Sequence, residues 1–126
     1  MRKHPTVLLL ADDQDLRETL EEILAESGYR VIASLRPDRL DSGLGNCSVD
    51  AVLADLPAAR SPSLELLRKL RAQSPAVPVL LMTSFGDSET WGRAMQLRAA
   101  AVLQKPFTTG QLLGAVEAAL KERKKR

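Results

Sequence analysis

Apolar residues in this chain gather into short continuous runs separated by segments of helical spacing. Four runs occupy residues 7–11, 51–54, 79–82 and 101–103, and a weaker one occupies 30–34. The four main runs do not alternate with polar residues, which is typical of strands buried on both faces of a parallel sheet. We therefore predict four buried strands and a fifth strand nearer an edge of the sheet.

Helical periodicity fills the intervals between the runs. Apolar residues recur every three or four positions over residues 16–24, 64–70, 91–95 and 112–120. A further helix around 38–44 is only weakly indicated, because glycines lie in or near it. Five strands that alternate with five helices predict an α/β protein with a doubly wound parallel sheet and helices on both faces.

Helix ends are indicated at both ends of the chain. We expect Asp15 to cap the first helix and Gly28 to follow its last residue. For the last helix, Thr108 and Gln111 have the spacing of a capping box, and the flanking apolar residues that of a hydrophobic staple.

Composition bounds the class of protein. The 126 residues fit one domain, residues 1–126, and the 44% of hydrophobic residues excludes a disordered chain. Aromatic residues are only 3%, which argues against base stacking on single-stranded nucleic acid. A single cysteine, Cys47, excludes an internal disulfide.

Charge and hydropathy limit the classes of binding partner that the sequence suggests. The net charge is +2, and the excess lies in a basic tail at 121–126, which is either the end of a helix or the start of a linker. No apolar stretch has the length of a signal peptide core or a membrane span. We expect a soluble, cytoplasmic protein without a membrane partner, and nucleic-acid binding only through a separate output domain.

Polar residues end the predicted buried strands. Asp12 and Asp13 follow the run at 7–11, and Asp55 follows the run at 51–54. Thr83 follows the run at 79–82, and Lys105 comes shortly after the run at 101–103. In a doubly wound sheet these positions share the carboxyl edge, where ligands bind. Each residue alone has a structural alternative as a turn former or helix cap, and for the acid pair the two alternatives are about equal. Their coincidence at four strand ends favours a site.

The chemistry of that site follows from its charges. Three close carboxylates repel one another unless a cation neutralises them, and oxygen ligands without His or Cys favour Mg²⁺. A carboxylate beside Mg²⁺ can attack phosphorus and form an acyl phosphate. Lys105 would offset charge on the transferred oxygens, and Thr83 would donate a hydrogen bond to them.

The chain resembles the response-regulator receiver family of two-component signalling over essentially its whole length. The matching pieces are the acid pair within residues 8–13, Asp55, Thr83 and the segment 103–107. The resemblance implies a flavodoxin-like strand order of 2-1-3-4-5. It also implies a domain that takes a phosphoryl group from a histidine kinase or phosphotransfer protein and signals by conformational change. Such a domain catalyses only its own phosphorylation and dephosphorylation, and it works with an output domain or a second copy as partner.

The resemblance also implies roles for individual residues. Asp55 would be the phosphorylated residue, with Lys105 and Thr83 as catalytic partners, and Lys105-Pro106 a cis peptide. The implied Mg²⁺ ligands are the following oxygen donors: Asp12, Asp13, Asp55 and the backbone carbonyl of Pro57.

This chain departs from the family pattern at several positions. Val102 stands where receivers carry Tyr or Phe, so we expect a switch without the usual aromatic. Ala59 and Ser63 replace a proline and a glycine after Asp55, which predicts an altered loop. Arg98 replaces a glycine that commonly ends the fourth helix. Because a left-handed cap costs about 1 kcal/mol for a non-Gly residue, we expect that helix to end differently.

Two other functions use the same fold. A pseudo-receiver would serve as an interaction module without phosphorylation, and Val102 with the altered loop favours it. A phosphatase of the haloacid dehalogenase type also uses a strand-end Asp and Mg²⁺. Asp13 and Asp15 would supply its acid pair, but Arg17 stands where that family requires Thr or Val, and the chain leaves no room for a cap domain.

Overall fold

The computed structural model describes residues 4–11, 13–33, 49–55, 67–69, 71–72, 76–84, 92, 94–96 and 98–124. Its strands are β1 (Thr6–Leu10), β2 (Arg30–Ala33), β3 (Ala51–Asp55), β4 (Val79–Thr83) and β5 (Ala101–Gln104). Its two long helices are α1 (Gln14–Glu26) and α5 (Thr109–Lys124). Helical residues at 67–69, 71–72, 92 and 94–96 belong to the predicted third and fourth helices. The predicted helix around 38–44 lies outside the described residues.

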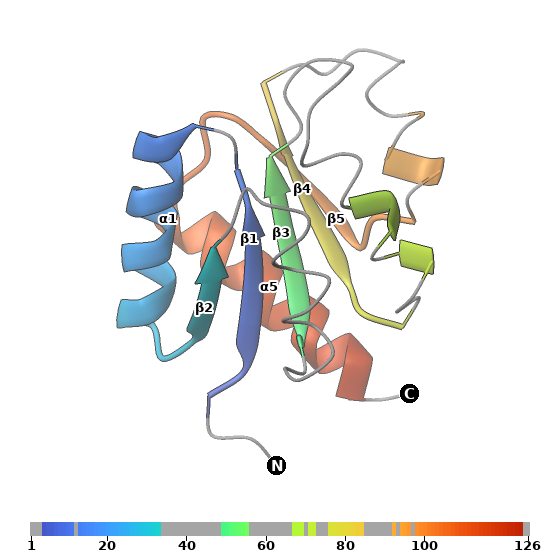
Figure 1. The fold of residues 1–126 in the computed structure, drawn as a ribbon, viewed down its shortest axis with the longest axis horizontal. Helices are drawn as coiled ribbons and strands as arrows, with labels where there is room; N and C mark the ends of the chain where they lie inside the picture. Colours follow the sequence, from blue (N-terminus) through green and yellow to red (C-terminus); the bar gives the residue numbers. More distant parts are fainter. Residues whose placement is uncertain are drawn as a thin grey trace.

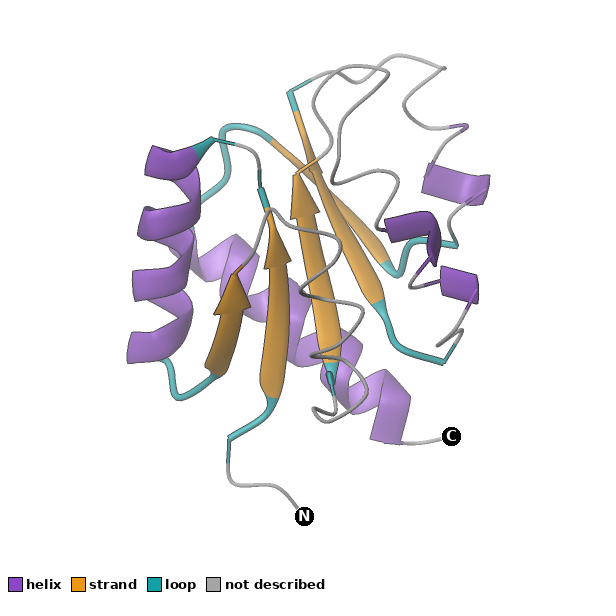
Figure 2. Ribbon diagram, viewed as in Figure 1, coloured by secondary structure: helices purple, strands orange, loops and turns teal. Residues whose placement is uncertain are grey.

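The five strands form one parallel sheet in the order β2-β1-β3-β4-β5, as the sequence predicted. Figure 1 and Figure 2 show α1 and α5 on one face of the sheet and the short helical segments on the other. All strand arrowheads point the same way, so the carboxyl ends of the strands share one edge.

Continuous apolar runs make the centre of the sheet. Every residue of β1, β3 and β4 is buried, whereas β2 and β5 at the two edges are only partly covered. One apolar cluster packs beneath α1 and α5 and includes Leu9, Leu53 and Leu80. A second cluster on the opposite face includes Leu8, Val52 and Leu81. Burial of each such leucine stabilises the fold by about 2 kcal/mol. The buried members of both clusters are all non-aromatic, and the rings of Tyr29 and Phe107 pack against the first cluster from its partly exposed margin.

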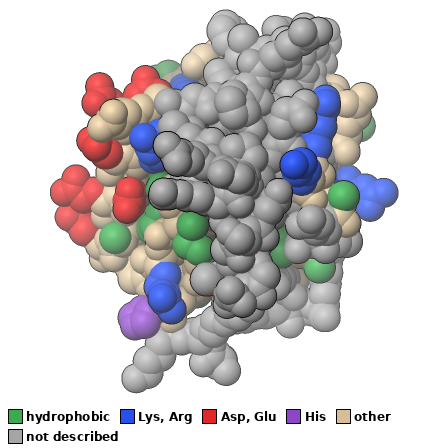
Figure 3. All heavy atoms as spheres, in the orientation of Figure 1, with side chains coloured by type: hydrophobic (Ala, Val, Ile, Leu, Met, Phe, Trp, Pro, Cys, Tyr) green, Lys and Arg blue, Asp and Glu red, His purple; other side chains and the backbone are tan. Residues whose placement is uncertain are grey.

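The outer face of α1 is acidic. Leu20 and Leu24 are buried against the sheet, while the opposite side of the helix carries exposed carboxylates. Figure 3 shows these acidic side chains gathered over α1. The pattern is that of an amphipathic helix with a solvated outer face. The part of the chain that the structure describes contains no helix with the length and hydropathy of a membrane span.

The N-terminus of α1 corrects one prediction. The N-cap is Asp13, not Asp15: Asp13 has extended backbone angles, and its Oδ1 accepts a hydrogen bond from the Leu16 amide at 3.0 Å. The chain leaves β1 and turns into the helix two residues earlier than the sequence pattern indicated. Asp15 therefore lies in the first turn, where its negative charge still favours the positive end of the helix dipole.

The other predicted helix ends at α1 and α5 are confirmed. Gly28 has a φ of 93°, and the amides of Gly28 and Tyr29 bond back to the carbonyls of Ala25 and Leu24. This is a Schellman motif with glycine in the left-handed position. At α5, the Thr108 amide donates to Gln111 at 2.8 Å and the Gln111 amide donates to Thr108 Oγ1 at 3.0 Å.

The helix that includes residues 94–96 ends in a left-handed cap at Arg98, which the sequence did not predict. Arg98 adopts a φ of 54°, and the amides of Arg98 and Ala99 bond to the carbonyls of Met95 and Ala94. The pattern is the Schellman motif of Gly28 with an arginine in the left-handed position. Met95, which the periodicity placed on the apolar face, is 79% exposed, and the buried contact comes from Ala94 alone among the described residues of this helix.

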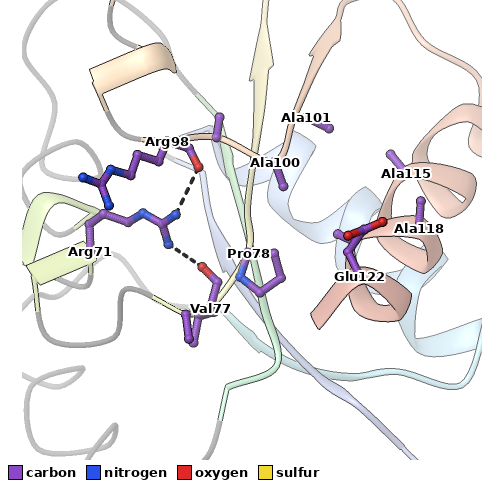
Figure 4. A pocket seen from close by; sticks show the side chains of 12 residues that line it. Arg71, Val77, Pro78, Arg98, Ala100, Ala101, Ala115, Ala118 and Glu122 are labelled. Atoms are coloured by element: carbon purple, nitrogen blue, oxygen red, sulfur yellow. Dashed lines mark hydrogen bonds between the residues drawn. The ribbon is translucent and has the colours of Figure 1, made fainter. Parts of the chain in front are cut away.

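Arg71 holds this strained turn in place. Its guanidinium donates to the carbonyl oxygens of Val77 at 2.5 Å and of Arg98 at 3.0 Å, which ties the start of β4 to the start of β5 (Figure 4). Burial lowers the pKa of Arg71, and the positive charge of Arg98 lowers it further. The long-range hydrogen bond from Arg71 to the Arg98 carbonyl thus offsets part of the backbone cost at Arg98, and the sequence rule took no account of it.

The backbone strain at Arg98 generates a stability prediction. We expect Arg98→Gly to raise the free energy of unfolding by about 1 kcal/mol, because glycine adopts a positive φ without steric cost. The measurement is urea denaturation at constant m-value. Gly28→Ala is the matched control: nothing lies within 4 Å of its ideal Cβ, so the strain alone should lower stability by a similar amount. An unchanged midpoint for Arg98→Gly would show that the turn carries no strain.

Tyr29 generates a second prediction, on alkaline stability. Burial raises the pKa of Tyr29 above its ordinary value of about 10, and the negative charge of Glu117 raises it further. The folded state therefore retains the phenol proton at pH values where the unfolded chain has lost it. The contribution of Tyr29 to the free energy of unfolding should be fully present below pH ~10 and should fall as the pH rises above that value. Tyr29→Phe should lose less stability between neutral and alkaline pH than the wild type, as urea denaturation at the two pH values would show.

Candidate functional site

The carboxyl edge of the sheet brings together three of the predicted site residues. Asp55 is the last residue of β3, Thr83 is the last residue of β4, and Lys105 directly follows β5. The register sets Asp55 beside Met82, and thus one step from Thr83. Because the strands are parallel and adjacent, residues far apart in sequence meet at this edge.

Asp55 and Lys105 form a direct ion pair. Lys105 Nζ lies 2.6 Å from Asp55 Oδ1, and the side chains are 27% and 7% exposed respectively. A carboxylate this deeply buried is costly unless a cation and hydrogen bonds compensate its charge. The pair spans β4, because Asp55 and Lys105 come from strands on either side of it.

Thr83 is the buried polar residue between these two partners. Only 2% of its surface is exposed, and its carbonyl oxygen accepts a hydrogen bond from the Lys105 amide at 2.8 Å. This backbone bond fixes the point from which the Lys105 side chain reaches back to Asp55. The peptide between Lys105 and Pro106 is cis, as the family resemblance implied.

The loop after β1 supplies the next part of the edge. Ala11 is fully buried, and its carbonyl oxygen accepts a hydrogen bond from Arg17 Nη1 at 2.9 Å. Asp13 caps α1 with Oδ1. Arg17 was not among the predicted site residues, although its position in the first turns of the helix that follows the strand end was the available signal. Asp12 lies outside the described residues.

The donor set decides whether the site suits a metal ion. Asp55 offers a carboxylate, and its Oδ2 has no hydrogen-bond partner among the described residues. Oxygen donors of this type fit Mg²⁺ and not a soft metal. Pro57, like Asp12, falls outside the described part of the chain, so the full ligand set stays a prediction. Among the described residues no three His, Cys, Asp or Glu side chains come together.

A pocket of about 380 Å³ lies elsewhere, at the opposite edge of the sheet. Figure 4 shows Arg71 and Pro78 on one side of it, and Ala115, Ala118 and Glu122 of α5 on the other. Pro78 and Ala100 directly precede β4 and β5, so the pocket opens at the amino ends of the strands. It contains none of the residues predicted for the site.

Fold and site together define a class of protein: a flavodoxin-like α/β domain with a buried, lysine-paired aspartate at the carboxyl edge of its sheet. The family model described as the response regulator receiver domain matches residues 7–117. The chain therefore belongs to the response-regulator receiver domain family. This membership argues against the phosphatase alternative.

Regulatory proteins are among its relatives. The chain is 28% identical over 116 residues to the transcriptional regulatory protein FixJ of Bradyrhizobium diazoefficiens, covering 92% of this chain and 57% of that protein. It is 34% identical over 118 residues to the C4-dicarboxylate transport transcriptional regulatory protein DctD of Pseudomonas aeruginosa, covering 94% and 26%. The chain thus spans between about a quarter and somewhat over half of the length of these relatives.

Solved structures share the fold. A response regulator receiver domain protein from Methanospirillum hungatei has a TM-score of 0.84 and 22% identity, with 97% of this chain and 98% of that chain covered. NtrX from Brucella abortus has a TM-score of 0.82 and 26% identity, with 96% and 28% covered. The predicted fold class and family are confirmed.

The ion pair predicts an asymmetry between its two partners. Lys105→Met should lower the free energy of unfolding by about 2 kcal/mol, because it leaves the Asp55 carboxylate buried without its cation. Asp55→Asn should cost clearly less, because Lys105 is partly exposed and its ammonium can reach water. Urea denaturation without Mg²⁺ measures both, and Lys121→Met on the exposed face of α5 is the control for loss of a lysine. Equal costs for the two variants would contradict this account of the pair.

Proposed function

We propose that this chain is a phosphoacceptor domain in which Asp55 takes a phosphoryl group from a histidine kinase or phosphotransfer protein. The observation that carries the proposal is the 2.6 Å pair between the buried Asp55 and Lys105 at the carboxyl edge of the sheet, in a chain of the receiver family. A carboxylate with an adjacent ammonium is the arrangement that a negatively charged phosphoryl donor requires.

The residues at the edge take the following parts. A carboxylate oxygen of Asp55 attacks phosphorus; the new P–O bond forms as the bond to the donor's leaving group breaks, and the leaving group keeps the electron pair. Lys105 moves its ammonium from the carboxylate toward the phosphoryl oxygens, whose charge it offsets. Thr83 holds Lys105 through its carbonyl and presents its hydroxyl as a donor to the same oxygens.

Magnesium fits this site as a cofactor, with Asp55 and the predicted Asp12, Asp13 and Pro57 carbonyl as candidate ligands. When bound, Mg²⁺ would neutralise charge shared between the carboxylates and the phosphoryl group. Beyond its own phosphorylation and dephosphorylation, we assign the chain no reaction on a free substrate.

The partners follow from the same proposal. FixJ, DctD and NtrX are longer than this chain, so we propose that an output region or a separate effector receives the signal. Val102 pairs with Leu81 and packs on the apolar cluster of its sheet face. A conformational signal would therefore use this aliphatic side chain in place of the family's aromatic. We place the protein in the cytoplasm, where a kinase can reach it.

Acetyl phosphate tests the function directly. Incubation with acetyl phosphate and Mg²⁺ should add one phosphoryl group to the intact protein, as mass spectrometry would show, and hydroxylamine should remove it. Asp55→Asn should take up none. Lys105→Met should take it up far more slowly, because the ammonium that offsets the developing charge is missing.

The outcomes separate the proposal from its alternative. An unmodified wild type, with no beryllofluoride binding in Mg²⁺, would overturn the proposal and establish the pseudo-receiver. An adduct that survives Asp55→Asn would place the acceptor elsewhere. Glu117→Gln on the exposed face of α5 is the control for loss of a carboxylate and should label like the wild type.

A further inference from the structure

The pocket of about 380 Å³ at the amino edge of the sheet has two walls of different chemistry. One wall carries Arg71 and Arg98, which lie side by side in Figure 4. The other wall is one face of α5, with residues at helical spacing: Ala115, Ala118, Ala119 and Glu122. Pockets that bind small molecules have volumes of about 300 to 1,000 Å³, so this one has room for a small ligand.

The two arginines have no anionic partner among the described residues. Arg71 uses Nη1 and Nη2 on the backbone carbonyls of Val77 and Arg98, which carry no net charge, and its buried Nε has no hydrogen-bond partner. Burial lowers the pKa of Arg71 and the positive charge of Arg98 lowers it further, so the two cations repel each other. An anion bound at this wall would relieve that repulsion.

The wall formed by α5 is apolar except at one end. Ala119 is buried and Ala118 is exposed, so the methyl groups lead from the surface of the sheet to solvent. Glu122 places a negative charge on this wall, across the pocket from Arg71 (Figure 4). An anionic group is therefore attracted to the arginine wall and repelled from the helix wall, which gives a ligand with one charged end a single favoured orientation.

We propose that this pocket binds a small carboxylate with an apolar body. The carboxylate pairs with the exposed guanidinium of Arg98, beside the charge of Arg71, and the apolar body lies on the alanines of α5. A carboxylate matches the planar guanidinium with two parallel hydrogen bonds, and the body removes methyl groups from water. The site is separate from the carboxyl edge and does not rest on the proposed function, because it uses none of the residues around Asp55.

Three probes test the proposal on the full chain in buffer without Mg²⁺: benzoate, its neutral isostere benzamide, and acetate, which has no ring. In amide correlation spectra recorded by NMR, benzoate should shift the signals of Ala99, Ala100 and Ala118 and leave that of Lys105 unchanged. Its dissociation constant should be on the order of 1 mM, as expected for so small a ligand. Benzamide and acetate should each bind at least about fivefold more weakly, because benzamide lacks the charge and acetate lacks the apolar body.

Two variants at exposed positions separate the walls. Arg98→Gln should weaken the binding of benzoate at least about fivefold and reduce its advantage over benzamide. Ala118→Leu should weaken both probes by at least about the same factor, because the larger side chain fills the pocket. Lys121→Gln is the matched control for loss of a cation and Ala25→Leu for a larger side chain on a helix surface, and both should bind benzoate like the wild type.

Each contrary result overturns a stated part of the proposal. Equal binding of benzoate and benzamide by the wild type would show that the arginine wall does not select an anion. Equal binding of benzoate and acetate would show that the alanines contribute nothing. If ~20 mM benzoate shifts no signal of the pocket, the whole proposal is wrong. A loss of affinity in Lys121→Gln as large as in Arg98→Gln would show that benzoate responds to the net charge of the chain and not to this pocket.

Discussion

The ion pair between Asp55 and Lys105 is the interaction on which the rest of this molecule depends. Asp55 is 6% exposed, and a bare carboxylate at that depth would cost several kcal/mol. The ammonium at 2.6 Å removes most of this cost. Asp55 lies at the end of β3 and Lys105 just after β5, on either side of β4. The ion pair therefore forms only when the strand order and the register of these three strands are correct. The ion pair thus depends on the topology of the sheet.

Most of this architecture could be predicted because it depends on burial, which leaves a strong mark in sequence. A strand covered on both faces must be apolar at every position, and β1, β3 and β4 are. Their predicted bounds agree with the structure to within a residue or two at each end. The places of Asp55 and Lys105 at the carboxyl edge could be predicted for the same reason, since an ionisable residue at the end of a strand has no place in the core. Their roles at that edge stay predictions.

The errors of prediction lie where local rules compete with tertiary contacts. Asp13 and Asp15 are both good caps, and only the exit direction of β1 decides between them. Arg98 does have a positive φ, so the backbone cost expected for a non-glycine residue in the left-handed region applies to it. The rule failed as a prediction of structure because Arg71, distant in sequence, bonds to the Arg98 carbonyl. Met95 shows the same limit: it directly follows Ala94 in the helix, so the two side chains point about 100° apart, and it is Ala94 that is buried.

The amino and carboxyl edges of the sheet are held by different kinds of contact. At the amino edge, Arg71 joins the starts of β4 and β5, and both of its carbonyl partners are backbone atoms whose charge does not change. At the carboxyl edge, the same two strands end in Thr83 and Lys105, and Lys105 is bound to a carboxylate whose charge does change if Asp55 accepts a phosphoryl group. A movement of Lys105 toward new phosphoryl oxygens would pull on the Thr83 carbonyl through the Lys105 amide. With the amino edge clamped, the displacement would fall on the carboxyl ends of β4 and β5. Val102, which lies in β5 between the two edges, would then report it through packing against Leu81 without an aromatic ring that swings.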